Sequence, residues 1–545
     1  MRSELSKLGP SPINVEKLTY YLDKYPNKED ANLLREGFTN GFRLQYTGNT
    51  FRSDVKNLKS ADLHLNELKD KLLKEVKLGR IIGPFDEPPL DNFKVSPVGL
   101  VPKSDGGWRL ITHLSYPYGD SVNDGIDDKL CSVSYTSFDK VSKMVFDLGS
   151  GALMAKRDIK SAFRLLPIHP DDFHLLGIKV DGKYYVDRML PMGLSLSCSL
   201  FEKFSTFLHW LVSCKSNLES LDHYLDDFIF AGKRQSNDCE LLVHIFSSIC
   251  MEIGVPIAEE KSVGPTTLLV FLGLELDSVI MSIRIPIQKI EELQSLLTGV
   301  LGKQKITLKD LQSLVGKLCF FCQAIRASRA FLRRFYDAMI PLKQPFHRLR
   351  LSKELKEDFK LWVSFLENFN GITYIPANAW LDSNCLQLFT DSSGTAELGC
   401  GCFYNGKWAF FKWPKIWYGT QVLCDITFLE MVPVLLAVKL WGELWKRQKI
   451  LLHIDNEALV YVINKQSSKS KRLMKLVREF ILLSMKLDIV FKAVHISSKS
   501  NGIADAISRI QLDRLKMLAP DASEEPEQIP ENFHSLILGL KLSDL

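Results

Sequence analysis

The sequence predicts an α+β fold followed by a separate α/β fold. Three observations support this prediction. Between about residues 95 and 285, short strand-like segments alternate with helical ones. Residues 288 to 370 are helical in pattern and basic, and from Leu386 to Arg509 strands and helices alternate again. A chain of 545 residues is too long for a single core, so three or four domains are expected.

Changes in composition place the expected domain boundaries. Apolar residues at helical spacing, among them Leu63, Leu68 and Leu72, predict a helical start, and Pro84 interrupts that pattern. The segment 524–527 gives the end of the chain a linker-like composition. The expected divisions are a helical N-terminal extension (1–88), the α+β domain (89–287), a helical basic region (288–380), the α/β domain (381–512) and an acidic, Pro-containing tail (513–545).

The basic charge of the chain is concentrated in one region. The whole chain carries a formal net charge of +5, whereas residues 303–350 hold eleven Lys or Arg residues against two Asp residues, a net charge of +9. Arg326, Arg329 and Arg333 have the spacing of one helix face. This pattern predicts either an ordinary solvated face or a surface that binds nucleic-acid phosphates without sequence preference and with steep salt dependence.

The eleven cysteines form no recognisable framework. Cys319 and Cys322 make the one Cys-x-x-Cys pair, and it lacks a second pair at zinc-finger spacing, which favours reduced thiols over a zinc site. No apolar stretch reaches the length of a membrane span, and the N-terminus does not resemble a signal peptide. We therefore expect an intracellular protein, in the cytoplasm or the nucleus, without a membrane partner.

The segment from His223 to Phe230 places Asp226 and Asp227 between two apolar runs. Such runs predict two strands joined by a tight turn. Two carboxylates in a mostly buried turn are costly unless a cation binds there, so a divalent metal is expected, although a solvated turn is the simpler alternative. Asp158 follows the apolar run 151–155 and would supply a third carboxylate, as two-metal chemistry requires.

These segments resemble the motifs of reverse transcriptases. Tyr224-x-Asp226-Asp227 is similar to the metal-binding hairpin of that family, and Asp158 with Phe163 five residues later is similar to its first catalytic motif. The resemblance implies that Asp158, the backbone of Ile159 and the hairpin carboxylates hold metal. It also implies that Phe163 packs where a ribose 2′-hydroxyl would lie, although Phe163 would equally suit a helix core.

Further matches follow in the order of the family's motifs. Lys103 and Arg109 flank a Gly-rich turn, as do the family's basic residues that bind the nucleotide triphosphate. Gly193, in the segment 190–195, would shape the nucleotide pocket; many members have glutamine where Met192 stands here. Lys261 resembles a lysine that acts as general acid on pyrophosphate, and Gly273 resembles part of the turn that grips the primer. The basic region 288–380 would then be the thumb and connection, and 89–287 the fingers and palm of a right hand.

A second set of acids lies in the α/β region. Asp391 and Asp455 end strand-like runs, and Glu430 and Asp505 lie in helical patterns. Each could be a helix cap or a surface charge, but together they resemble the ribonuclease H site, which implies that all four acids hold two metal ions at an RNA phosphodiester. For His495, the alternatives are assistance in product release and a structural role, and its place at an expected strand end favours the structural role. The run 391–394 resembles an aspartic protease motif less well, because it has an extra serine.

The resemblance implies an RNA-directed DNA polymerase joined to ribonuclease H, with two Mg²⁺ ions per site and Mn²⁺ as a substitute. Its partners would be an RNA template, a DNA primer, an RNA–DNA hybrid and dNTPs. Alternatives are an inactive or domesticated copy that only binds nucleic acid, and a polymerase that prefers DNA templates. Finer features of the sequence resemble the DIRS-like, tyrosine-recombinase group of retrotransposons. These features are residues 13–15, 37–38, 41–43 and 121–125 and the acidic tail. This resemblance adds a recombinase encoded by the same element as a partner.

Overall fold

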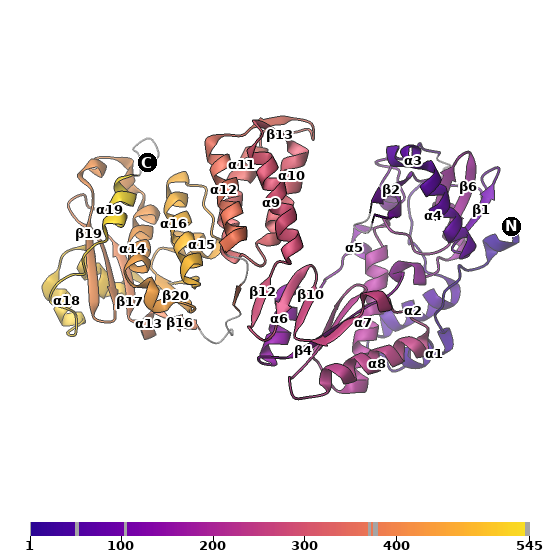
Figure 1. Ribbon diagram of the computed structural model, residues 1–545, viewed down its shortest axis with the longest axis horizontal. Helices are drawn as coiled ribbons and strands as arrows, with labels where there is room; N and C mark the ends of the chain where they lie inside the picture. The colour runs from indigo at the N-terminus through magenta and orange to yellow at the C-terminus, as the bar shows by residue number, and fades with distance from the viewer. Residues whose placement is uncertain (1, 50–53, 103–105, 369–371, 374–379, 540–545) are drawn as a thin grey trace. The chain divides into compact units, whose positions relative to one another are not determined.

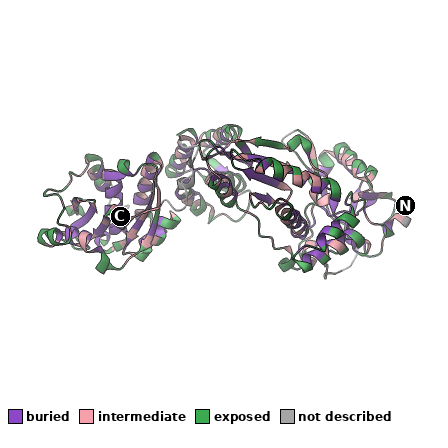
Figure 2. Ribbon diagram, turned by 90° about the horizontal axis from the view of Figure 1, so that it is seen from below, coloured by how far each residue is buried: buried purple, intermediate pink, exposed green. Residues whose placement is uncertain are grey.

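The structure is a computed structural model that describes residues 2–49, 54–102, 106–368, 372–373 and 380–539 (Figure 1). The chain divides into two compact units, residues 1–272 and 273–545. In both units the buried residues lie on the inner faces of helices and sheets (Figure 2). In the described part of the chain, no helix combines the length and the apolar character needed to cross a membrane.

The first unit begins with helices that pack onto the hydrophobic core of its sheet. Asn14 and Asn27 cap the first two helices by accepting hydrogen bonds from backbone N–H groups. Leu22 and Leu34 then reach the core that also contains Phe204. The helices of this segment are α1 (Val15–Leu22), α2 (Lys28–Asn40), α3 (Lys59–Leu63) and α4 (Leu65–Lys77).

The central sheet of the first unit has the order β7-β8-β4-β9. Strands β7 and β8 form a hairpin, and β4 pairs antiparallel with β8, so that Asp158 lies opposite Asp227. Helices α7 and α8 pack against this sheet (Figure 1). Their bounds are β4 (Leu153–Asp158), β7 (Leu221–Tyr224), β8 (Asp227–Gly232), β9 (Val263–Thr266), α7 (Ser197–Ser216) and α8 (Asp238–Ile253).

Two smaller sheets complete the first unit. One has the order β1-β6-β5, and the other consists of β2 and β3, which pair antiparallel. The remaining elements are β1 (Ile81–Phe85), β2 (Val98–Pro102), β3 (Trp108–Thr112), α5 (Asp128–Cys131), α6 (Phe138–Asp147), β5 (Gly177–Val180), β6 (Lys183–Asp187) and β10 (Leu268–Phe271).

The second unit begins with a mostly helical part. Residues Arg326–Leu332 form a 3-10 helix, and α11 starts only at Arg333, so the expected single α-helical face for Arg326, Arg329 and Arg333 is not present. The elements are β11 (Leu274–Asp277), β12 (Ser282–Arg284), α9 (Ile287–Leu301), β13 (Lys305–Thr307), α10 (Leu308–Phe321), α11 (Arg333–Met339), β14 (Arg348–Arg350), α12 (Lys353–Asn368) and β15 (Ile372–Thr373).

The rest of the second unit has mixed strand directions. Strands β17, β18 and β19 pair antiparallel, whereas β16, β20 and β21 pair parallel. Helix α14 is buried on nearly all sides and contacts both β17 and β18. These elements are β16 (Trp380–Asp382), α13 (Ser383–Leu386), β17 (Leu388–Ser392), β18 (Gly399–Tyr404), β19 (Lys407–Lys412), α14 (Ile426–Trp441), β20 (Lys449–Ile454), α15 (Glu457–Lys465), α16 (Lys471–Leu487), β21 (Val490–His495) and α17 (Gly502–Ser508).

The acidic segment after Leu512 packs against strand β19 despite its linker-like composition. It contains α18 (Leu512–Leu518) and α19 (Glu531–Leu538). The indole N–H of Trp408 donates to the backbone oxygen of Ser523, and Phe533 is fully buried against Phe411. Buried apolar side chains therefore hold residues 513–539 in place.

Two candidate active sites

A cavity of about 420 Å³ opens beside the hairpin of the first unit. Its lining includes Asp158, Asp226, Lys261, Arg109 and Met192. These residues come from five separate segments of the chain, which are β4, the β7–β8 turn, the segment before β9, β3 and the turn before α7. The fold thus brings predicted site residues more than 150 positions apart to one cavity.

The hairpin turn exposes its carboxylates through backbone geometry. Leu225 has a φ of +53°, in the left-handed region. The Asp226 carbonyl accepts a hydrogen bond from the Ile159 N–H at 3.0 Å, and this bond fixes the turn against the end of β4. The side chains of Asp226 and Asp227 therefore start from a backbone that is tied to that of Asp158.

Lysines neutralise two of the three carboxylates. The Lys261 ammonium lies 3.0 Å from both Asp158 oxygens, and the Lys156 ammonium lies 3.1 Å from Asp227. Burial raises the pKa of Asp226 to about 6, and the charges of Asp158 and Asp227 contribute to the rise. Burial likewise raises the pKa of Asp158, even with Lys261 in contact.

The donor set fits a hard divalent cation. Three carboxylates and a buried backbone at Ile159 are oxygen ligands of the kind that Mg²⁺ prefers. The raised pKa values of Asp158 and Asp226 express repulsion and desolvation that a bound cation would relieve. The three aspartates are not among the tightly gathered groups, with ligand atoms within 4.8 Å of one another, found in the described part of the chain.

The two predicted aromatic residues pack beside the cavity and do not line it. The Phe163 ring meets that of Phe201 edge-on with centroids 5.6 Å apart, which agrees with the helix-core alternative. The Tyr224 ring lies against that of Tyr135 with centroids 4.7 Å apart. Both rings therefore contact other aromatic side chains of the first unit.

The remaining predicted residues of the first site have different placements. Gly193 has a φ of +100°, and a Cβ there would lie 2.5 Å from the Thr112 carbonyl oxygen, so a side chain is excluded. Gly273 has a φ of +80°, and its carbonyl accepts a hydrogen bond from Lys289 at 3.0 Å. Lys103 lies outside the described residues.

The cavity has further basic residues that sequence reasoning missed. Lys71 and Lys74 of α4 line it, as do Arg80 and Lys160. In the sequence, Lys71 and Lys74 stand at i, i+3 spacing, which also suits any solvated helix face. Their role becomes visible only when α4 is seen to pack next to β3, which carries Arg109.

The second unit gathers a tighter acidic group. Asp391 at β17, Glu430 on α14 and Asp455 after β20 have ligand atoms within 4.8 Å of one another. Ser508 donates a hydrogen bond of 2.5 Å to Asp391, and the Ser392 hydroxyl donates one of 2.9 Å to Glu430. Among the described residues, no lysine or arginine forms an ion pair with these three acids, whereas Arg509 and Arg514 pair with Asp505.

The pKa values of this group reflect its burial. Burial raises the pKa of Asp391 to about 6, and the charges of Asp455 and Asp505 add to the rise. Burial raises the pKa of Glu430 well above its ordinary value, with further contributions from Asp391 and Asp455. Three oxygen ligands that repel one another at this distance fit a divalent cation.

Asp505, the fourth predicted acid, is occupied by cations. Arg509 and Arg514 donate hydrogen bonds of 2.6 and 2.5 Å to its carboxylate. Burial opposes ionisation, but these two hydrogen bonds lower the pKa of Asp505 overall. His495 is exposed at the end of β21. The structure thus gathers three of the four acids and holds the fourth next to them by ion pairs.

A basic cavity of about 830 Å³ lies within the second unit. Its lining includes Arg333, Arg350, Lys469, Lys471 and Arg478, from the helical part and from α16. Next to it, Arg334 and Arg478 both donate to the carboxylate of Asp358, which is fully buried. This ion triad ties α11, α12 and α16 together.

Comparison with known proteins gives a family for part of the chain. Residues 101–276 match the family model described as reverse transcriptase (RNA-dependent DNA polymerase). Protein P of a duck hepatitis B virus (strain Germany/DHBV-3) is 28% identical over 184 residues, which are 33% of this chain and 23% of that protein. The Gag-Pro-Pol polyprotein of simian retrovirus SRV-1 is 25% identical over 273 residues, 48% of this chain and 14% of that protein. The matched part is thus about a quarter or less of each relative.

A solved structure has a similar fold. The foamy viral protease–reverse transcriptase in complex with double-stranded DNA is 16% identical, with a TM-score of 0.50, and the match covers 88% of this chain and 81% of that one. The matched family model includes Asp158, Asp226 and Lys261, which line the first cavity, and Asp227, which lies opposite Asp158 on the neighbouring strand. Residues 101–276 therefore form a reverse transcriptase domain.

Proposed function

We propose that this chain is an RNA-directed DNA polymerase that also has ribonuclease H activity. One observation carries the proposal. Asp158 and Asp226 of the reverse transcriptase domain share one cavity with Lys261 and Arg109 of that domain and with Lys71 and Lys74 of the preceding helix α4. Carboxylates on one side and cations around them suit a metal-bound nucleoside triphosphate, which carries both kinds of complementary charge.

In the proposed polymerase site, Asp158, Asp226 and Asp227 would hold two Mg²⁺ ions, with Mn²⁺ as a substitute, and the Ile159 backbone would lie beside them. Bound metal would supply activation of the primer 3′-hydroxyl and neutralisation of charge on the triphosphate. Arg109, Lys71 and Lys74 would bind the phosphates of the dNTP. Lys261 lies on Asp158 in this structure and has a side chain 57% exposed, so it is free to turn to the pyrophosphate as general acid.

The second activity is proposed from the acidic group of the second unit. Asp391, Glu430 and Asp455 would hold two metal ions at a phosphodiester of the RNA strand, and Asp505 would join them when released from Arg509 and Arg514. Ser508 and Ser392 orient the two most buried carboxylates by hydrogen bonds. The mixed order of strands β17 to β21 supports an α/β ribonuclease H-like domain over 381–512.

We further propose the fingers and palm over 89–287 and a basic thumb or connection over 288–380. The cavity lined by Arg350, Lys469 and Lys471 supports the binding of a template–primer backbone. The DIRS-like subgroup, and with it a recombinase partner, rests on the sequence features given above. A tree built from residues 101–276 tests it, because grouping with hepadnaviral or retroviral domains would contradict it.

The test of the main proposal is primer extension by the purified full chain with Mg²⁺ or Mn²⁺, on RNA and on DNA templates. We expect dNTP incorporation on both templates and cleavage of the RNA strand of a labelled hybrid. Extension confined to DNA templates would refute the RNA-directed assignment. Binding of hybrid duplex without extension or cleavage, with either metal, would instead identify a nucleic-acid-binding copy.

A further inference from the structure

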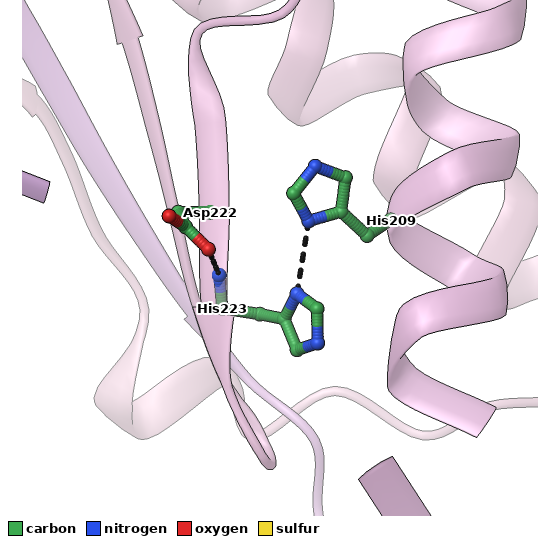
Figure 3. Close-up of side chains that lie close together, drawn as sticks. All are labelled: His209, Asp222 and His223. Atoms are coloured by element: carbon green, nitrogen blue, oxygen red, sulfur yellow. Dashed lines mark hydrogen bonds between the residues drawn. The ribbon is translucent and has the colours of Figure 1, made fainter. Parts of the chain in front are cut away.

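A pair of histidines lies behind the catalytic hairpin and takes no part in the proposed chemistry. His209 is on α7 and His223 is on β7, one residue before Tyr224. Their Nδ1 atoms point toward each other at 2.9 Å (Figure 3). Asp222 is the adjacent residue of β7, and the ligand atoms of all three side chains lie within 4.8 Å of one another.

We propose that His209, His223 and Asp222 form a binding site for a transition-metal ion such as Zn²⁺, separate from both acidic sites. Two imidazole nitrogens bound to zinc at about 2.0–2.1 Å in tetrahedral geometry stand about 3.3 Å apart. The observed separation of 2.9 Å between the Nδ1 atoms needs only a small opening to reach that value. Imidazole ligands favour Zn²⁺ over Mg²⁺, which distinguishes this site from the carboxylate sites.

The surroundings prepare His223 as a ligand. Its Nε2 lies 3.2 Å from the Glu202 carboxylate, and its ring stacks on Phe228 with centroids 5.1 Å apart. The two groups do not have hydrogen-bond geometry, but the negative charge of Glu202 beside Nε2 favours the proton on that nitrogen and leaves the Nδ1 lone pair for a metal. His223 is 93% buried by this packing, since its exposed fraction is 7%.

His209 faces His223 through the same ring nitrogen. The two imidazole rings are nearly perpendicular, at 74°, with centroids 5.1 Å apart. Without a metal, one ring must carry a proton between the two Nδ1 atoms. Metal binding moves that proton to the Nε2 of His209, so no net proton is lost from the pair.

The adjoining cavity supplies access and negative charge. It has a volume of about 830 Å³ and is lined by three acids, Glu202, Glu219 and Asp222, against one lysine, Lys140. Lys140 lies 3.0 Å from the Asp222 carboxylate and has a side chain 68% exposed. The metal would replace this ammonium at Asp222, and water from the cavity would take the fourth position.

The first test measures metal content. The full chain is stripped with a chelator, dialysed against Zn²⁺ with excess Mg²⁺ to saturate the carboxylate sites, and assayed for zinc. We expect His209→Gln to hold one zinc fewer per chain than wild type. His244→Gln, an exposed histidine on α8, is the matched control and should equal wild type. Equal zinc content in wild type and His209→Gln would overturn the proposal.

The second test does not depend on whether a variant folds. X-ray absorption at the zinc edge of wild-type protein should show two imidazoles with oxygen ligands, whereas a shell of cysteine sulfur or of oxygen alone would overturn the site.

The third variant, Lys140→Met, removes the competing ammonium. We expect it to bind Zn²⁺ about tenfold more tightly, and a loss of affinity would exclude Asp222 as a ligand.

Discussion

The two acidic sites differ in how the protein balances their negative charge. At the hairpin of the first unit, Lys261 and Lys156 each contact one carboxylate. In the second unit, Asp391 and Glu430 receive hydrogen bonds from serines, and arginines contact only Asp505. In the proposed mechanism, a metal would displace an ammonium at the first site. At the second site it would relieve repulsion that the serines and the more distant Arg509 offset only in part.

This difference leads to separable effects on the two proposed activities. The largest effect is expected for Asp226→Asn, because no lysine in the described part of the chain forms an ion pair with that carboxylate, which would bind metal directly. We expect primer extension to fall by about 10³-fold or more, equivalent to about 4 kcal/mol of transition-state stabilisation. Steady-state extension assays check this, with Asp171→Asn, an exposed aspartate of the same unit, as the control. Retained extension would contradict the polymerase site.

The corresponding change in the second unit is Asp455→Asn. We expect hybrid cleavage to fall by a similar factor of about 10³, while extension stays within about twofold. Cleavage of a labelled hybrid and extension on the same preparation measure both. Asp513→Asn, an exposed aspartate on α18, is the control. Joint loss of both activities would show that the two sites do not work independently.

The lysine that balances the first site gives a smaller effect. We expect Lys261→Met to lower the rate of extension by about 10²-fold, because general acids contribute about 10² to 10⁴ to such steps. The pH–rate profile should lose its alkaline limb, since the Asp158 carboxylate raises the pKa of Lys261 despite burial. Lys233→Met, exposed on the same unit, is the control. An unchanged profile would leave Lys261 with a charge-balancing role alone.

The repulsion in the second site should appear as a pH-dependent loss of stability. Because the folded pKa of Asp391 is about 6, raised from 3.8, its ionisation destabilises the metal-free fold progressively from about pH 4 to pH 6 and fully above that. We expect Asp391→Asn to raise the free energy of unfolding at pH 7 by up to about 3 kcal/mol, with no gain near pH 4. Denaturant unfolding in chelator measures it.

Asp158→Asn tests the charge balance of the first site against that of the second. It removes a repelling charge but also removes the ion pair with Lys261, so the expected gain in metal-free stability is smaller than for Asp391→Asn, about 1 kcal/mol or less. The same denaturant measurement at pH 7 checks this order. A larger gain for Asp158→Asn would mean that Lys261 contributes nothing to charge balance at the first site.

Short sequence motifs predicted much of the acidic site in the first unit. An Asp-Asp pair between apolar runs predicts a hairpin because strands and turns are local structures, and the structure has a hairpin there in β7 and β8. The pairing of β4 with β8, which sets Asp158 opposite Asp227, is not local. The sequence placed Asp158 near the hairpin only through the need of two-metal chemistry for a third carboxylate and through the resemblance. Phe163 shows the limit of prediction from motif spacing, because its spacing is compatible with both a substrate contact and a core position.

The sequence by itself determined the acidic residues, their order and the concentration of positive charge after residue 288, because these depend on residue identity and spacing along the chain. The tertiary structure alone decided which cations face which acids. Lys71 and Lys74 join the first cavity, Arg514 holds Asp505, and His209 meets His223, because helices and strands distant in sequence pack together. Such contacts depend on packing between elements, which no local pattern encodes.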